Sequence, residues 1–297
     1  MQLISTYPKE SPLSFEHRFL LQPYLLENRH SISELSMASL YPFTKKRYYT
    51  VSNYDEDHYI IRGFQENNGK KERFAILPSG YPTKELIVDL FKDVDEINTI
   101  GEHNYKEWQQ KLEKDNLPYK VVEDRDNADY IYDRQSLVDL VGQALHKKMA
   151  HAKKFSQSYP NRIIVPSHLV KTEDMVEVLD QWAEGKDVVE DYNATLLAIN
   201  LREELKMRGI VVFVDNKPVA FTLAEMDGED RVITHIEKAL VQYKGIFQYI
   251  NRAFAKDLPS SVTEINRAQD LGIPGLRQAK LTYEPKRLLM KYKIRKD

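Results

Sequence analysis

The segment from residue 262 to 285, VTEINRAQDLGIPGLRQAKLTYEP, constrains the fold more than any other stretch of the chain. It opens with a β-branched run typical of a strand, passes through a turn rich in glycine and proline, and continues into a helix-prone piece. Polar and charged side chains gather at the turn: Asn266, Arg267, Gln269, Asp270, Arg277 and Lys280. Because open α/β sheets bind ligands where strands end in such loops, the segment predicts a ligand site. A surface loop with an Asp270–Arg277 ion pair is the alternative.

Strand and helix patterns alternate from residue 47 onward. In the first half the patterns predict strands at 47–53, 58–64, 73–77 and 119–123, and helices at 82–97 and 104–114. In the second half they predict strand 163–165, helices 173–183 and 191–207, and a hairpin of 210–214 and 219–223. Strand 232–239, helix 244–256, the 262–285 segment and a closing strand near 288–294 follow. One long helix, residues 134–157, is predicted to link the halves.

The motif NRAQDLGIPGLRQAKLTYEP resembles the signature of the phosphatidylglycerol lysyltransferase C-terminal-like family of bacterial proteins. The resemblance runs from ISELSMASLYPF near the start to the final strand. It implies an α+β fold of two tandem GNAT-like (acyl-CoA N-acyltransferase) modules, with mixed central sheets flanked by helices, related to the Fem-type aminoacyl-tRNA transferases. On this basis residues 1–133 form an N-terminal module, and residues 134–297 form a C-terminal module that carries the site.

The amino-acid composition limits the kinds of site and partner that the chain can have. The 297 residues include no cysteine, which excludes disulfides, thiolate nucleophiles and cysteine–zinc sites and is consistent with a cytoplasmic protein. The longest apolar runs, such as residues 210–214, are far shorter than the ~20 residues that span a bilayer. Residues 277–297 contain eight Lys/Arg and two acids, a net +6 within a chain of net charge −2. Such a tail can attract tRNA or an anionic lipid, although lysines that protect an edge strand are the alternative.

Two residues of the strand VITHIEKAL are candidates for proton transfer. The two-residue period of a strand predicts His235 and Glu237 on the same face. An imidazole and a carboxylate so placed can share a water or a substrate amine. Glu237, with His235, is therefore the predicted general base. Structural hydrogen bonds across the sheet are the alternative.

The next turn, Gln242-Tyr243-Lys244-Gly245, opens a helix whose unpaired N–H groups can cradle an anion. GNAT enzymes use a similar Gln/Arg-x-x-Gly-x-Gly/Ala turn for the pyrophosphate of acyl-coenzyme A. The resemblance therefore implies that Gln242, Lys244 and Gly245 bind the donor. Phe247 replaces the last small residue of that motif. This departure weakens the coenzyme A interpretation and favours an aminoacyl-tRNA donor.

The turn of the 262–285 segment supplies the predicted substrate-binding residues, which are Asn266, Arg267, Asp270, Arg277, Lys280 and Tyr283. Arg267 and Arg277 could clamp a carboxylate or phosphate, with Asp270 orienting one of them. Tyr283 could stack on a base or ring. Ala268 departs from the family pattern, in which an acidic residue is expected at this position.

The stretch LHKKMAHAKKF, residues 145–155, is expected to be a solvated basic helix with Leu145, Met149 and Ala152 as its apolar seam. His146 and His151 are five apart and do not share a helix face for a metal. The sequence contains no nucleotide P-loop, dinucleotide fingerprint, His-Glu-x-x-His or Gly-x-Ser-x-Gly motif, and no metal site is predicted.

Together with these patterns, the family resemblance implies a transferase without a required cofactor. It would move an acyl group, most simply an aminoacyl group from tRNA, to an amine or hydroxyl acceptor such as a small molecule or a lipid head group. Acyl-CoA is the alternative donor, and a non-catalytic ligand-binding module of the same fold is a third interpretation. The sequence indicates neither the acceptor nor the oligomeric state.

Overall fold

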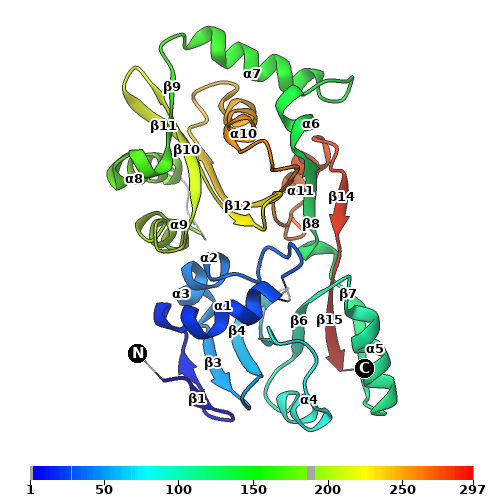
Figure 1. The fold of residues 1–297 in the computed structure, drawn as a ribbon. Coiled ribbons are helices and arrows are strands. Elements are labelled where there is room, and N and C mark those ends of the chain that lie inside the picture. The colour runs from blue at the N-terminus through cyan, green and yellow to red at the C-terminus, as the bar shows by residue number, and fades with distance from the viewer. Residues whose placement is uncertain (1–2, 28, 68, 186–190, 297) are drawn as a thin grey trace. The chain divides into compact units, whose positions relative to one another are not determined.

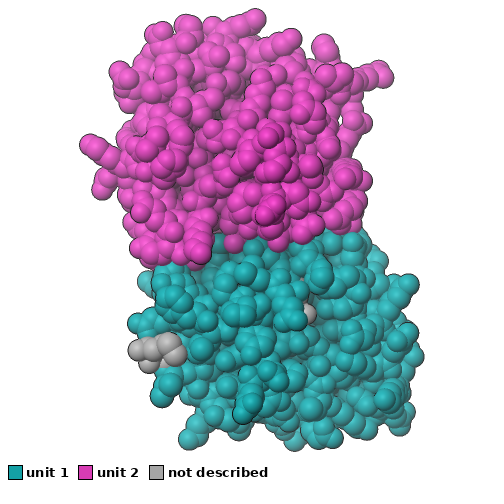
Figure 2. All heavy atoms as spheres, viewed as in Figure 1, with its two compact units in different colours: residues 1–128, 289–297 teal, residues 129–288 magenta. Residues whose placement is uncertain are grey.

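The computed structural model describes residues 3–27, 29–67, 69–185 and 191–296. The chain divides into two compact units, one of residues 1–128 with 289–297 and the other of residues 129–288 (Figure 2). Each unit has a mixed sheet of its own, flanked by helices (Figure 1). The predicted α+β class is confirmed.

The sheet of unit 1 has the strand order β1-β3-β4-β5-β6-β15-β7, with β2 beside β3. Its strands are β1 (Ser5–Thr6), β2 (Ser11–Pro12), β3 (Thr50–Asn53), β4 (Tyr59–Asn67), β5 (Lys70–Ile76), β6 (Glu96–Gly101), β7 (Tyr119–Glu123) and β15 (Lys291–Lys296). β4 and β5 form an antiparallel hairpin, whereas β5 and β6 run parallel, with Phe74 opposite Glu96.

Five α-helices belong to the described part of unit 1, namely α1 (Arg18–Glu27), α2 (Met37–Leu40), α3 (Thr44–Arg47), α4 (Lys84–Leu90) and α5 (Tyr105–Lys114). Thr83 caps α4 by accepting a hydrogen bond from the Leu86 N–H. The apolar faces of α4 and α5 bury Ile87 and Trp108 with Ile97 and Ile294 in one core cluster.

The sheet of unit 2 has the order β14-β8-β13-β12-β11-β10-β9. Its strands are β8 (Asp129–Asp133), β9 (Ile163–Pro166), β10 (Arg208–Val214), β11 (Lys217–Asp227), β12 (Arg231–Ala239), β13 (Glu264–Asn266) and β14 (Arg287–Leu289). The predicted hairpin is confirmed, because Val214 lies opposite Lys217 and both turn residues, Asp215 and Asn216, have positive φ.

The described helices of unit 2 are α6 (Arg134–Asp139), α7 (His146–Ser158), α8 (Thr172–Ala183), α9 (Tyr192–Asn200), α10 (Ile246–Asp257) and α11 (Pro274–Leu281). Residues 218–225 of β11 are all buried, which requires helices over both faces of the sheet. α8 packs on β11 and β12, α10 packs on β10 and β11, and α7 lies against α10 (Figure 1). The predicted order of hairpin, strand, glycine-led helix, strand, helix and strand is confirmed.

Two strands, β8 and β15, lie in a different sheet from the one that their place in the sequence suggests. β8 precedes the predicted module boundary at residue 133 but lies between β13 and β14 in the sheet of unit 2. β15, in turn, lies between β6 and β7 in the sheet of unit 1. The closing strand predicted near 288–294 is therefore two strands, β14 and β15, in different sheets.

Three predicted helices are shorter than expected. The helix predicted over 191–207 ends with α9 at Asn200. The continuous helix of residues 134–157 is wrong, because the chain leaves α6 at Leu140 with φ of 48° and turns again at Gly142 before α7 begins. The helix predicted over 82–97 ends with α4 at Leu90, and the strand β6 was missed. Val94 and Ile97 continue the helical spacing, but Ile97 pairs with Ala75 in the sheet.

Candidate functional site

The candidate site lies where β12 and β13 separate. The two strands pair in parallel from Arg231–Glu264 to Ile233–Asn266, after which the chain turns away from β12. Glu237 on β12 and Arg267 after β13 then face each other, and Glu237 Oε1 accepts a hydrogen bond from Arg267 Nη2 at 3.1 Å. Their side chains are only 14% and 16% exposed. The structure thus joins two of the predicted site residues in a largely desolvated ion pair.

The second carboxylate oxygen of Glu237 lacks a protein partner in the described part of the chain. Oε2 is buried and has no hydrogen-bond partner among the residues that the structure describes. A buried acceptor left without a donor costs about 1–3 kcal/mol, more when it is charged. A substrate N–H or O–H at Oε2 would remove this cost.

Arg267 holds Glu237 in place and is itself held by its neighbours. With its amide oxygen turned toward the guanidinium, Asn251 accepts from Arg267 Nε and Nη1 at 3.2 Å each. The guanidinium carbon lies 5.8 Å from the ring centre of Tyr132 and 5.2 Å from that of Tyr283. Burial alone would lower the pKa of Arg267, but Glu237 and the two phenol oxygens outweigh burial and raise it. The guanidinium therefore stays charged and fixed.

Two lysines add positive charge beside Arg267. Lys280 Nζ donates to the carbonyls of Arg267 and Ala268, and burial, followed by the charge of Arg267, lowers the pKa of Lys280 to about 7. Lys148 of α7 lies 4.6 Å from the ring centre of Tyr283, and burial with Arg267 also lowers the pKa of Lys148. These cations favour an anionic ligand or a developing negative charge.

Tyr283 forms a wall of the site. Burial raises its pKa to about 12, a shift that Arg267 opposes and Glu237 reinforces. Its ring is only 6% exposed and is contacted by Lys148 and Arg267. Stacking of Tyr283 on a base stays a prediction.

Asp270 ties the loop together. Its buried carboxylate accepts from Tyr130 Oη at 2.6 Å, from Gly272 N at 2.9 Å, and from Arg277 Nε and Nη2 at 2.9 Å each. The Asp270–Arg277 ion pair that the alternative interpretation expected is present, whereas Arg267 pairs with Glu237. A clamp of both arginines on one bound anion stays a prediction.

Asn266 also shapes the turn. Its amide donates to Asp129 Oδ2 at 2.9 Å and accepts from the Ala268 N–H at 2.7 Å. That second bond fixes Ala268 at a φ of 54°. Asn266 is 3% exposed, so it acts through the backbone that presents Arg267.

His235 lies away from Glu237, and the predicted shared face is wrong. β12 has a β-bulge at His235, because Thr234 pairs with Ala224 and Ile236 pairs with Leu223. Glu237 consequently lies opposite Thr222, whereas His235 Nε2 contacts Glu225 Oε1 at 2.7 Å. Residues 222 and 225 project from opposite faces of β11, so the imidazole cannot assist Glu237 directly.

The predicted donor turn precedes α10. The side chains of Gln242 and Lys244 are exposed there. Gly245 has φ of 91°, and a Cβ added to it would meet the His151 carbonyl oxygen of α7 at 2.2 Å. Close packing against α7 therefore explains this glycine without a ligand.

Residues 27–295 match the family described as "Phosphatidylglycerol lysyltransferase, C-terminal". The chain belongs to this family. Membership in this family supports a transferase related to phosphatidylglycerol lysyltransferases. No curated protein matches the chain.

Solved structures share the fold. A conserved protein of unknown function from Bacteroides thetaiotaomicron VPI-5482 is 24% identical, with a TM-score of 0.80 over 97% of this chain and 99% of that one. L-PGS from Bacillus licheniformis is 13% identical, with a TM-score of 0.59 over 99% of this chain and 94% of that one. Within the described ranges, no helix has the length and apolar character to cross a membrane.

Sequence analysis missed Lys148, because α7 was taken as a solvated basic helix. Leu145, Ala152 and Phe155 are buried at the spacing i, i+7 and i+10, and Lys148 at i+3 falls on the same stripe. A lysine on the buried stripe of a helix is the signal that could have identified it. Asn251 gave no comparable signal.

Proposed function

We propose that the site in unit 2 transfers an aminoacyl group from tRNA to an amine or hydroxyl acceptor. The observation that carries this proposal is the carboxylate of Glu237, with one oxygen held by Arg267 and the other buried without a partner. Such a group is oriented to take a proton from an attacking nucleophile.

In the proposed step the acceptor lone pair attacks the carbonyl carbon of the aminoacyl ester. Its proton moves to Glu237 Oε2, the ester C–O bond breaks, and the proton passes to the leaving ribose oxygen. Negative charge that develops on the ester oxygens is stabilised by the guanidinium of Arg267 and the ammonium of Lys148. Positioning of two bound substrates supplies the remaining acceleration, and no covalent nucleophile is invoked.

The basic residues near the site suit a nucleic-acid donor. Lys147, Lys153 and Lys154 are exposed on α7, the helix that carries Lys148, and they can neutralise phosphates. The acceptor is an amine or hydroxyl, and an anionic lipid head group is included in that class because the family name specifies phosphatidylglycerol.

Acyl-CoA is the second candidate donor, favoured by the position of the Gln242–Gly245 turn at the start of α10. Against it, α7 packs on Gly245, and the ring of Phe247, which replaces a small residue, is 38% exposed beside the turn. A bulky ring there obstructs the approach of a pyrophosphate to the helix N-terminus.

The donor is tested by incubating the protein with a pool of charged tRNAs and by titrating it calorimetrically with acetyl-CoA. Loss of the aminoacyl ester above the rate without protein, together with no saturable heat from acetyl-CoA, supports the proposal. Saturable binding of acetyl-CoA without discharge of tRNA supports acyl-CoA as the donor instead. If neither occurs, the chain is a binding module of the same fold.

A further inference from the structure

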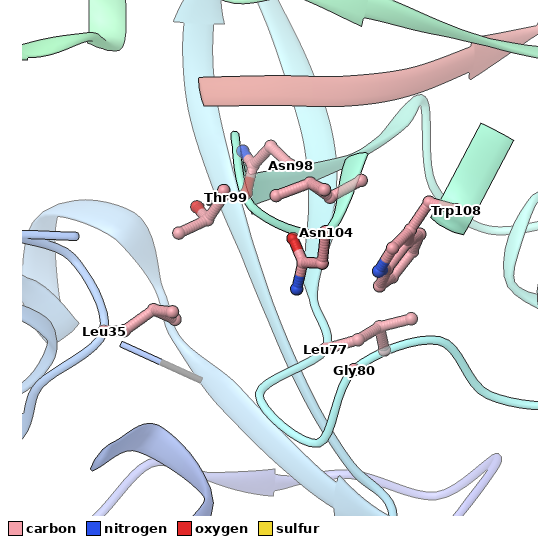
Figure 3. Close-up of a pocket in the computed structure, with 9 residues that line it drawn as sticks. Leu35, Leu77, Gly80, Asn98, Thr99, Asn104 and Trp108 are labelled. Atoms are coloured by element: carbon pink, nitrogen blue, oxygen red, sulfur yellow. Dashed lines mark hydrogen bonds between the residues drawn. The ribbon is translucent and has the colours of Figure 1, made fainter. Parts of the chain in front are cut away.

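Unit 1 contains a small pocket at the carboxyl ends of its parallel strands β5 and β6 (Figure 3). Its cavity volume is about 20 Å³, which is room for about one water-sized group. Leu77 and Gly80 after β5, residues 98–101 of β6, and Trp108 of α5 line it. Open sheets bind ligands beyond the carboxyl ends of parallel strands, so the pocket occupies the position where a ligand is expected.

Asn104 presents an unsatisfied acceptor to this pocket. It is the N-cap residue of α5, yet its side chain makes no capping hydrogen bond, although asparagine in that position normally accepts from the first turn. Its Oδ1 is buried and has no partner among the described residues. Figure 3 shows the amide directed into the space between Leu77 and β6.

Trp108, one turn further along α5, presents a donor to the same space. Its side chain is 3% exposed and packs edge-on against Tyr81, with ring centres 5.2 Å apart. Among the described residues no partner is found for its indole N–H, which lies on the edge facing Asn104 in Figure 3. Unlike Asn104 Oδ1, the indole nitrogen is not fully buried, so its N–H can donate to a molecule that enters this space.

The backbone of β6 is strained where it borders the pocket. Thr99 has φ of 64°, a conformation that is an outlier for a β-branched residue. The pairing of β6 with β15 passes from Ile97 to Ile100 across this point, so the ladder skips Asn98 and Thr99. Strain of this kind persists at binding sites, where it directs particular groups toward a ligand.

We propose that this pocket binds the hydroxyl group of an uncharged molecule. A hydroxyl donates one hydrogen bond and accepts others, which matches one orphan acceptor on Asn104 and one orphan donor on Trp108. The residues that line the pocket carry no charge, so an ionic ligand would lose its hydration without compensation. Leu35, Leu77 and Ile100 would contact the carbon atoms that bear the hydroxyl.

The proposal is tested by titrating glycerol into ¹⁵N-labelled protein and following the indole N–H signals. The chain has two tryptophans, Trp108 and Trp182, so a Trp108→Phe variant assigns the two signals. We expect the Trp108 signal to shift and saturate at millimolar glycerol, while the Trp182 signal stays in place. Inorganic phosphate should leave both signals unchanged.

Asn104→Leu, which keeps the number of side-chain heavy atoms and removes the amide oxygen and nitrogen, should weaken the glycerol response at least about tenfold. Because Asn104 does not cap α5, the fold should tolerate this change. Glu237→Gln should leave the response intact, which separates this site from the proposed transferase site. An unmoved Trp108 signal in the wild-type protein, an equal response in Asn104→Leu, or an equal shift with phosphate would each overturn the proposal.

Discussion

Replacing Gly245 by alanine tests whether packing against α7 shapes the turn before α10. Gly245 has φ of 91°, and an added Cβ would lie 2.2 Å from the His151 carbonyl oxygen. The left-handed conformation costs an L-residue about 1–2 kcal/mol, and overpacking of a filled interior costs about 1–3 kcal/mol more. We therefore expect Gly245→Ala to lower the free energy of unfolding of unit 2 by about 2–5 kcal/mol.

Gly275 provides the matched control within the same unit. It lies in α11 without a positive φ, and no heavy atom lies within 4 Å of an added Cβ. Alanine there should raise the free energy of unfolding by about 0.5–1 kcal/mol, because glycine is the poorer helix former.

Urea titrations in a Trp108→Phe background report this difference, because the fluorescence of Trp182 then follows unit 2 alone. The two alanine variants should shift the midpoint in opposite directions. A Gly245→Ala midpoint equal to or above that of the parent protein would refute the packing explanation. If that variant kept its stability but lost donor binding, Gly245 would instead belong to a ligand cradle.

Three further predictions concern the site and its surroundings. The pKa of Lys280 in the folded protein is about 7, whereas the ordinary pKa of a lysine is 10.5. The unfolded chain therefore binds more protons between these values, and the free energy of unfolding should rise by about 2–5 kcal/mol from pH 7 to 10.5. Urea titrations of Lys280→Met should not show that rise. An unchanged dependence of stability on pH in this variant would contradict the prediction. Asp270→Ala should cost about 3–5 kcal/mol in thermal unfolding, because Arg277 loses its buried partner; a cost below about 1 kcal/mol would show that the ion pair does not hold the loop. His235→Gln should change the transfer rate less than about twofold, because His235 contacts Glu225 on the other face of the sheet. A hundredfold loss of rate would show that His235 takes part in the reaction.

Local signals in the sequence predicted part of the site. The strand VITHIEKAL and the turn of the 262–285 segment were both identified from sequence as sources of site residues. In the structure β12 and β13 are neighbours, and this arrangement brings Glu237 to Arg267. The Asp215-Asn216 hairpin was equally predictable, because its turn type is encoded by the two residues themselves.

Features that depend on distant pairing were not predictable. The bulge at His235 is invisible in the alternation of β12, because it is defined by the register against β11. Likewise β8 and β15 are ordinary strands in sequence, and only pairing across more than a hundred residues places each in its sheet. Lys148 was missed because a charged residue conceals the buried stripe of α7.

The most direct test of the central claim compares single-turnover transfer by wild-type protein, Glu237→Gln and Glu229→Gln with one charged tRNA and its acceptor. Glu229 is an exposed residue of the β11–β12 turn, so it serves as a matched control. Loss of a general base costs about 10²–10⁴-fold in rate. We predict such a loss for Glu237→Gln alone, with its unfolding midpoint retained. Equal rates for all three proteins would contradict the assignment of Glu237 as the proton acceptor.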